Sequence, residues 1–235
     1  MLPELRHRPL DLQLRHVFRI ARGSSNVRHN LLVEAEAEGR VGLGEAAPIV
    51  RYGEDRASAA RAVDVMAPRL GDARVFAAAA RRAAVPGQSA AEAAVDMALH
   101  DLAGQRLQAP LFELLGLDPS DTPQTSFTIG MDAPEVVAAK VREASEYPIL
   151  KVKMGSDDDR AMLEAVRDTT DRPLRVDANE GWTPAGAVER LEWLATLGVE
   201  LVEQPLPAAM IAETRELRRL SPLPFYADES VHRAA

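Results

Sequence analysis

The sequence predicts an α/β protein: a TIM-type (β/α)8 barrel, of which about five βα units are present, preceded by an N-terminal α+β domain. From Thr125 onward, short apolar or β-branched runs alternate with helical stretches, and the pattern repeats about every 25 residues. Four consecutive runs end in Lys153, Asp177, Glu203 and Asp228, each just before a loop. Functional groups at the carboxyl ends of successive parallel strands are how such a barrel builds an active site.

The composition is that of a globular protein with a sizeable core: 235 residues, of which 46% are hydrophobic and 27% charged. The net charge of −8 argues against a nucleic-acid partner, since binding a phosphate backbone needs clustered Lys and Arg. Because cysteine is absent, neither disulfides nor thiolate metal sites can form. No apolar run reaches about 18 residues and the start has no signal-peptide pattern, so we expect a cytoplasmic protein without a membrane partner.

The first 45 residues predict β-structure, because apolar and polar residues alternate along them. The string EAEGRVGLGE predicts a hairpin whose glycines allow the turn and the close approach of another backbone. Two polar, glycine-bearing segments, residues 21–30 and 47–55, are predicted to be mobile loops.

Helices are predicted over residues 56–115, where Ser89 is a candidate N-cap and Glu92 completes a capping box. Two prolines in residues 118–123 indicate a boundary between structural units. The predicted domains are therefore residues 1–120, an α+β domain, and residues 121–235, the βα units.

The second domain contains five predicted strands, which fall near residues 126–130, 149–153, 173–177, 199–203 and 224–228. Four helices are predicted near residues 134–146, 158–170, 184–197 and 209–220. Closing a barrel takes eight strands and typically about 250 residues in all. We therefore expect this sequence to be a portion of a longer protein; the alternative is that the remaining strands come from elsewhere.

The four polar residues at the predicted strand ends have the chemistry of a metal site with a base beside it. Asp177, Glu203 and Asp228 would supply carboxylate oxygens, which suit a hard divalent ion such as Mg²⁺. Lys153 would be the base, and to act it must lose its proton, so its pKa must fall from about 10.4. Burial, the ion and the ammonium of Lys151, which shares its strand face, would each lower that pKa.

Each of these residues alone has an ordinary structural interpretation. A Lys-x-Lys pair is usually a solvated strand edge, and an acidic residue after a strand is often a helix cap. Four such groups in register on four consecutive strands are harder to explain by capping. The pattern as a whole therefore favours a functional site.

The strings KVK, VDAN, VEQP and ADES, in this order and spacing, resemble the enolase superfamily and within it the muconate-cycloisomerase-like branch. The resemblance implies that Lys153 is a catalytic base with Lys151 beside it, and that Asp177, Glu203 and Asp228 bind Mg²⁺. It also implies α-proton abstraction through a metal-stabilised enediolate, the chemistry of this superfamily. The N-terminal region resembles the family's capping domain, with substrate-covering loops at residues 21–30 and 47–55.

Local strings, among them IARGS, RYGE and TSFTIGMD, resemble the dipeptide epimerases, most of all those acting on L-Ala-D/L-Glu. This resemblance implies substrate-binding roles for Arg22, Thr128 and Tyr52, with Arg22 reaching the side-chain carboxylate of a Glu residue. The alternatives are a solvated loop arginine, a strand-end hydroxyl bonded to local backbone, and a tyrosine packed on its own domain. Asn179 and Gln204 follow metal ligands and are expected to orient the carboxylates or waters.

The resemblance implies an isomerase: a Mg²⁺-dependent epimerase of a small dipeptide, fitting the handling of cell-wall peptides, with a homo-oligomer left open. The alternatives are an o-succinylbenzoate synthase or N-acylamino-acid racemase, a muconate cycloisomerase, or an inactive truncated homologue. The second lysine base that the family carries after a sixth strand would lie about 25 residues past Asp228, beyond this sequence.

Overall fold

The computed structural model describes residues 3–70 and 76–231, and its contacts divide the chain into two compact units. The first contains residues up to Leu14 and Val27–Thr122, and the second contains Arg15–Asn26 and Pro123 onward. Residues 15–26 therefore belong with the second unit, although the sequence assigns them to the first domain. No helix within the described ranges is long and apolar enough to cross a bilayer.

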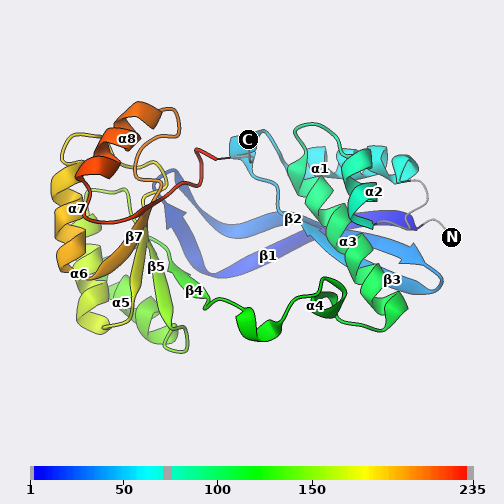
Figure 1. Cartoon of the computed structure of the whole chain (residues 1–235), viewed down its shortest axis with the longest axis horizontal. Coiled ribbons are helices and arrows are strands. Elements are labelled where there is room, and N and C mark those ends of the chain that lie inside the picture. Colours follow the sequence, from blue (N-terminus) through cyan, green and yellow to red (C-terminus); the bar gives the residue numbers. More distant parts are fainter. Residues whose placement is uncertain (1–2, 71–75, 232–235) are drawn as a thin grey trace. The chain divides into compact units, whose positions relative to one another are not determined.

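The first unit contains an antiparallel hairpin within a three-stranded sheet (Figure 1). Its strands, in the order β1-β2-β3, are β1 (Glu4–Ile20), β2 (Gly23–Ala37) and β3 (Arg40–Ala46). Glu38 and Gly39 connect β2 to β3 with φ angles of 54° and 71°, which a tight turn matching the strand twist requires. The predicted hairpin is confirmed, but the predicted loop at 21–30 is wrong from Gly23 onward, because β2 already begins there.

The helices of the first unit are α1 (Arg56–Met66), α2 (Phe76–Ala83), α3 (Ser89–Leu107) and α4 (Leu111–Leu114). Three 3₁₀ turns accompany them: η1 (Val50–Tyr52), η2 (Ala67–Arg69) and η3 (Pro119–Asp121). Helix α3 lies directly on β3 at Gly42 and Gly44, where a Cβ would overlap the helix backbone at Ala98 and Ala94. The two glycines therefore give the close backbone approach that the sequence predicts.

The predicted capping box at Ser89 is wrong. Ser89 is the first residue of α3, and Gln88 before it makes no side-chain cap. The buried carboxylate of Glu54 caps the helix instead, accepting hydrogen bonds from Ser89 N (2.8 Å), Ser89 Oγ (2.6 Å) and Ala90 N (3.0 Å). A negative charge at a helix N-terminus satisfies unpaired N–H groups and the helix dipole together.

The second unit contains the predicted parallel sheet of five strands, in the order β4-β5-β6-β7-β8. Its strands are β4 (Ser126–Ile129), β5 (Ile149–Lys153), β6 (Leu174–Asp177), β7 (Val199–Glu203) and β8 (Phe225–Tyr226). Between them run α5 (Pro134–Glu143), α6 (Asp159–Thr169), α7 (Ala187–Thr196) and α8 (Ile211–Leu220). Strand and helix alternate as the sequence predicts, and β8 is the shortest strand.

The core of the second unit lies between the sheet and its helices (Figure 1). Leu150 and Val152 of β5 belong to it, together with helix residues such as Leu163 and Leu191. Because strand side chains alternate, Lys151 and Lys153 stand on the opposite face of β5 from these core residues. The apolar positions thus attach the strand to the helices, while the lysines project from the face that would line a barrel.

An ion pair supports the start of α5. Lys140 Nζ lies 3.0 Å from Asp132 Oδ2, and the side chain of Lys140 is only 6% exposed. Burial tends to raise the pKa of the Asp132 carboxyl, but the hydrogen bonds from Lys140 and the Ala133 N–H outweigh it and hold that pKa below its usual value. The pair therefore stabilises the folded unit while Asp132 is ionised.

Replacement of Asp132 by asparagine is expected to lower the free energy of unfolding by about 2 kcal/mol at neutral pH, because a buried ammonium loses its partner. The depressed pKa means that this stabilisation is complete above the unfolded pKa of about 3.9 and is lost as pH falls through the folded value. Urea denaturation at pH 7 and near pH 3 would measure both effects. Asp171→Asn, at an exposed position, is the matched control; an equal loss in both variants would contradict the role of the pair.

Candidate metal and catalytic site

Strand register brings three of the four predicted residues into one row. Lys153 pairs with Asp177 across β5 and β6, and Asp177 pairs with Glu203 across β6 and β7. The row continues to Tyr226 on β8, not to Asp228. Because paired residues of a parallel sheet stand side by side, a lysine and two carboxylates share one edge of the sheet.

The two lysines converge on one carboxylate oxygen. Asp177 Oδ2 lies 2.6 Å from Lys153 Nζ and 2.9 Å from Lys151 Nζ. Lys151 Nζ also donates to Glu203 Oε1 at 2.7 Å. Lys151 and Lys153 therefore share a strand face, as their spacing predicts, and a single ammonium group already contacts both neighbouring carboxylates.

These contacts set the protonation of the row. Burial would raise the pKa of the Asp177 carboxyl, but the charge and hydrogen bond of Lys153, with the hydrogen bond from Lys151, hold it below its usual value. The pKa of Glu203 is raised, first by burial and then by the nearby charge of Asp177. For Lys151, burial is outweighed by hydrogen bonds to Glu203 and Asp177, so its pKa is raised and it stays an ammonium.

Asp228 does not join the row. The sequence places it at the end of a strand, but β8 ends at Tyr226, and the side chain of Asp228 lies exposed in the segment that follows. Within residues 3–70 and 76–231, no three acidic or histidine side chains are grouped so that they could hold a metal ion. The structure thus brings together two of the three predicted ligands, and the assignment of all three to an ion stays a prediction.

The two carboxylates nevertheless fit a divalent ion in chemical type. Asp177 Oδ2 and Glu203 Oε1 both lie within 3 Å of Lys151 Nζ. The two carboxylates are therefore close enough together to bind one cation. Carboxylate oxygens are the donors that Mg²⁺ prefers in proteins. The donor set is therefore compatible with a hard cation.

Asn179 and Gln204 follow these carboxylates in the sequence, and both have positive φ angles, 44° and 37°. The backbone N–H of Asn179 donates to Asp177 Oδ1 at 2.9 Å, which fixes the orientation of that carboxylate. Gln204 Oε1 accepts hydrogen bonds from the backbone N–H groups of Asp228 (3.0 Å) and Ser230 (3.2 Å). Asn179 therefore acts on a carboxylate, and Gln204 acts on the backbone of the segment that carries Asp228.

Arg22 is not a solvated loop arginine. Its Nη1 donates to Asn179 O (2.8 Å), Glu180 Oε2 (2.9 Å) and Glu229 Oε1 (2.6 Å). The sequence did not single out Glu229, which is 1% exposed and directly follows Asp228. The residues around Glu229 in ADES give no signal of its burial, because its partner Arg22 is distant in the sequence.

Phe18 and Thr128 lie near the row, whereas Tyr52 belongs to the other unit. The Phe18 ring lies 6.0 Å from Lys153 Nζ, so an aromatic face adjoins the predicted base. Thr128 on β4 pairs with Lys151 on β5, which places it beside the row. Tyr52 lies in η1 of the other unit with 43% of its surface exposed, and its substrate role stays a prediction.

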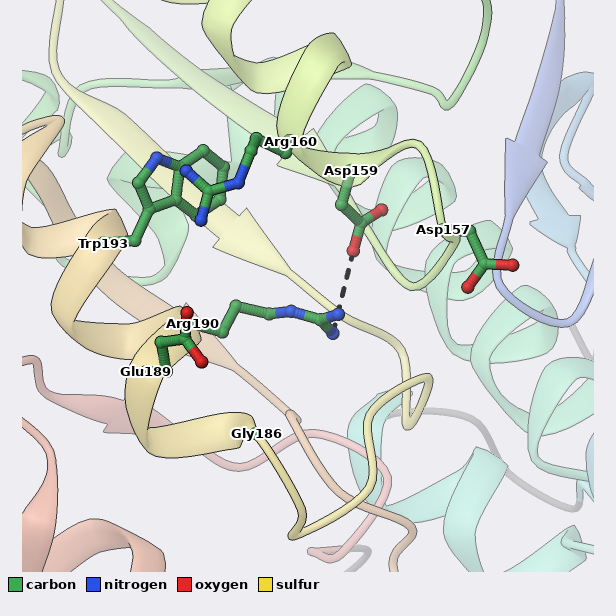
Figure 2. Close-up of a pocket in the computed structure, with 7 residues that line it drawn as sticks. All are labelled: Asp157, Asp159, Arg160, Gly186, Glu189, Arg190 and Trp193. Atoms are coloured by element: carbon green, nitrogen blue, oxygen red, sulfur yellow. Dashed lines mark ion pairs between the residues drawn. The ribbon is translucent and has the colours of Figure 1, made fainter.

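A cavity of about 300 Å³ lies between the N-terminal ends of α6 and α7 (Figure 2). Both of its arginines contact neighbouring side chains: Arg190 reaches Asp159 at 3.9 Å, and Arg160 stacks on Trp193 at 4.5 Å. Arg190 also lies over the ring of the buried Trp182, 5.0 Å from its centroid. The cavity contains none of the predicted site residues, so it belongs to the helical layer. It is lined by Asp157, Asp159, Arg160, Gly186, Glu189, Arg190 and Trp193.

Comparison with known families identifies the family to which the chain belongs. Residues 6–116 match the N-terminal domain of the mandelate racemase and muconate lactonizing enzymes, and residues 135–235 match the enolase C-terminal domain-like family. The chain belongs to the enolase superfamily. The resemblance predicted from KVK, VDAN, VEQP and ADES is therefore confirmed, together with the fold that it implies.

Individual members of the superfamily resemble this chain over nearly all of its length. It is 40% identical to an L-Ala-D/L-Glu epimerase of Bacteroides thetaiotaomicron, covering 96% of this chain and 60% of that enzyme. It is 38% identical to an L-Ala-D/L-amino acid epimerase of Pedosphaera parvula, covering 96% and 68%. A dipeptide epimerase of Cytophaga hutchinsonii, complexed with Mg and D-Ala-L-Val, superposes with a TM-score of 0.88 at 26% identity, covering 98% and 66%. The chain thus spans 60% to 68% of the lengths of these relatives.

Proposed function

We propose that the protein is a Mg²⁺-dependent dipeptide epimerase, an isomerase that inverts the α-carbon of the second residue of a small dipeptide. The observation that carries the proposal is the row in which Lys153 adjoins Asp177, and Asp177 adjoins Glu203, at one edge of a parallel sheet. Relatives at 38% and 40% identity are named as epimerases of L-Ala dipeptides, which supports this chemistry over the other activities of the superfamily.

Asp177, Glu203 and Asp228 are the residues that would hold Mg²⁺. When bound, the ion would offset the negative charge that builds on the substrate carboxylate as the neighbouring α-proton leaves. Lys153 would take or return that proton on one face of the α-carbon, with Lys151 beside it. Asn179 would keep Asp177 in orientation through its backbone N–H, and Gln204 would hold the backbone at Asp228.

The proposed substrate is an Ala-Glu dipeptide. Arg22 would bind the side-chain carboxylate of its second residue, because a guanidinium presents paired donors that match a carboxylate. Thr128 would hydrogen-bond the dipeptide beside the row, and Tyr52 would cover it. The handling of cell-wall peptides in the cytoplasm would fit this activity.

A screen for incorporation of solvent deuterium tests the proposal. The full-length protein, incubated in D₂O with MgCl₂ and a panel of L-Ala dipeptides, is expected to exchange the α-proton of the second residue and to form the other epimer. NMR would follow both changes. The panel should include muconate and an N-acylamino acid; turnover of one of these, without exchange in any dipeptide, would replace the epimerase proposal with that activity.

A further inference from the structure

The tip of the β1–β2 hairpin, residues 15–26, is closely fitted to the sheet of its unit. Ala21 Cβ lies only 2.7 Å from where a Cβ on Gly155 would stand, and 2.9 Å from the same position on Gly181. Gly155 follows β5 and Gly181 follows β6, so the tip packs against the loops at the carboxyl ends of these two strands. A backbone hydrogen bond also joins the tip to the segment after β4, since Met131 N donates to Arg19 O at 3.0 Å.

Arg22 uses one nitrogen for all of its hydrogen bonds with the described residues. Nη1 contacts one carbonyl and two carboxylates, whereas Nε and Nη2 have no partner among those residues. About a third of the side chain, 34%, is exposed. The guanidinium is therefore held through Nη1 alone, and Nε and Nη2 are available to a ligand.

Glu229 makes the shortest of these contacts and is the most deeply buried of the partners. Its Oε1 accepts from Arg22 Nη1 at 2.6 Å and from Asn179 Nδ2 at 3.2 Å, and its Oε2 has no partner in the described part of the chain. A buried carboxylate without a counter-charge is strongly unfavourable, so Arg22 and Glu229 fix each other. Asn179 in turn holds Asp177, which links the hairpin tip to the row.

We propose that Glu229 is a positioning residue for substrate specificity. By holding Arg22 through Nη1, it presents the remaining donors of the guanidinium to the side-chain carboxylate of an acidic second residue. Glu229 itself does not touch the substrate; it acts through Arg22. This inference rests on the proposed dipeptide epimerase function, and it assigns the preference for an acidic dipeptide to a buried residue next to Asp228.

Kinetic comparison of two dipeptides tests the inference in the full-length protein. Glu229→Gln is expected to raise KM for L-Ala-L-Glu by about tenfold, because a neutral amide no longer fixes the guanidinium. KM for L-Ala-L-Leu should rise by a much smaller factor. The matched control is Glu216→Gln, an exposed glutamate of α8 paired with Arg219, which should change neither value. Equal rises for the two dipeptides would overturn the inference.

A double-mutant cycle and a measurement without substrate complete the test. Arg22→Met should cause a similar loss of preference, and adding Glu229→Gln to it should cause little further loss, because coupled residues are not additive. Hydrogen exchange of the tip amides, residues 20–26, should be faster in Glu229→Gln than in Glu216→Gln. Unchanged tip exchange would overturn the positioning role even if no dipeptide reacts, whereas faster tip exchange without any α-proton exchange would support that role and contradict the epimerase.

Discussion

In the full-length protein, Lys153→Ala is expected to abolish exchange of the dipeptide α-proton with solvent from one of the two epimers, with a loss of about a thousandfold or more. Lys153 Nζ adjoins Asp177 at the sheet edge, and nothing else on β5 carries a removable proton except Lys151. NMR of each epimer separately in D₂O would measure the loss. Removing a general base should leave binding of the dipeptide largely intact, so kcat should fall more than KM rises.

Lys153→Arg is the matched control for the loss of charge. Arginine keeps a positive group beside Asp177 but is not deprotonated at working pH, so it should be as inactive as alanine while keeping the fold. Normal exchange from both epimers in Lys153→Ala would remove Lys153 as the base. Restored exchange in Lys153→Arg would show that its charge, not its proton, matters.

Asp177→Asn is expected to have the second large effect: a rise of about tenfold or more in the Mg²⁺ concentration needed for half-maximal activity, with a loss of activity at saturation. Asp177 is fully buried and its Oδ2 contacts both lysines, so the change removes the central negative charge of the row. Titration of activity with MgCl₂, before and after a chelator, would measure the shift.

Asp171→Asn, at an exposed position of the same unit, controls for general effects of the substitution. Thermal unfolding of both variants would separate a folding defect from a weakened site. Wild-type activity that survives chelator unchanged would argue against a metal, and an Asp177→Asn enzyme with an unaltered Mg²⁺ requirement would argue against Asp177 as its ligand.

Local patterns were sufficient to predict the βα units, because strand alternation and helix periodicity are encoded over neighbouring residues. The alignment of Lys153, Asp177 and Glu203 was also predictable, since each ends a strand and neighbouring parallel strands are in register. Asp228 departed from this rule because β8 has only two residues and stops before it. Strand length at a sheet edge depends on partners that a short segment of sequence does not encode.

The other differences come from contacts between distant parts of the chain. Glu54, not Ser89, caps α3, across 35 residues of sequence. Glu229 is buried because Arg22 meets it across 207 residues. Propensity and spacing carry no information about such pairs, so the sequence alone identified Arg22 but not the acidic residue that fixes it.

The lysine contacts have a practical consequence for chemical labelling. The 235 residues contain three lysines, Lys140, Lys151 and Lys153, and otherwise carry their positive charge mainly on arginine. Their side chains are 6%, 21% and 11% exposed, so a reagent such as formaldehyde with a mild reductant should methylate Lys151 first. Mass spectrometry of partly methylated protein would then report, at a single position, whether a molecule shields the sheet edge.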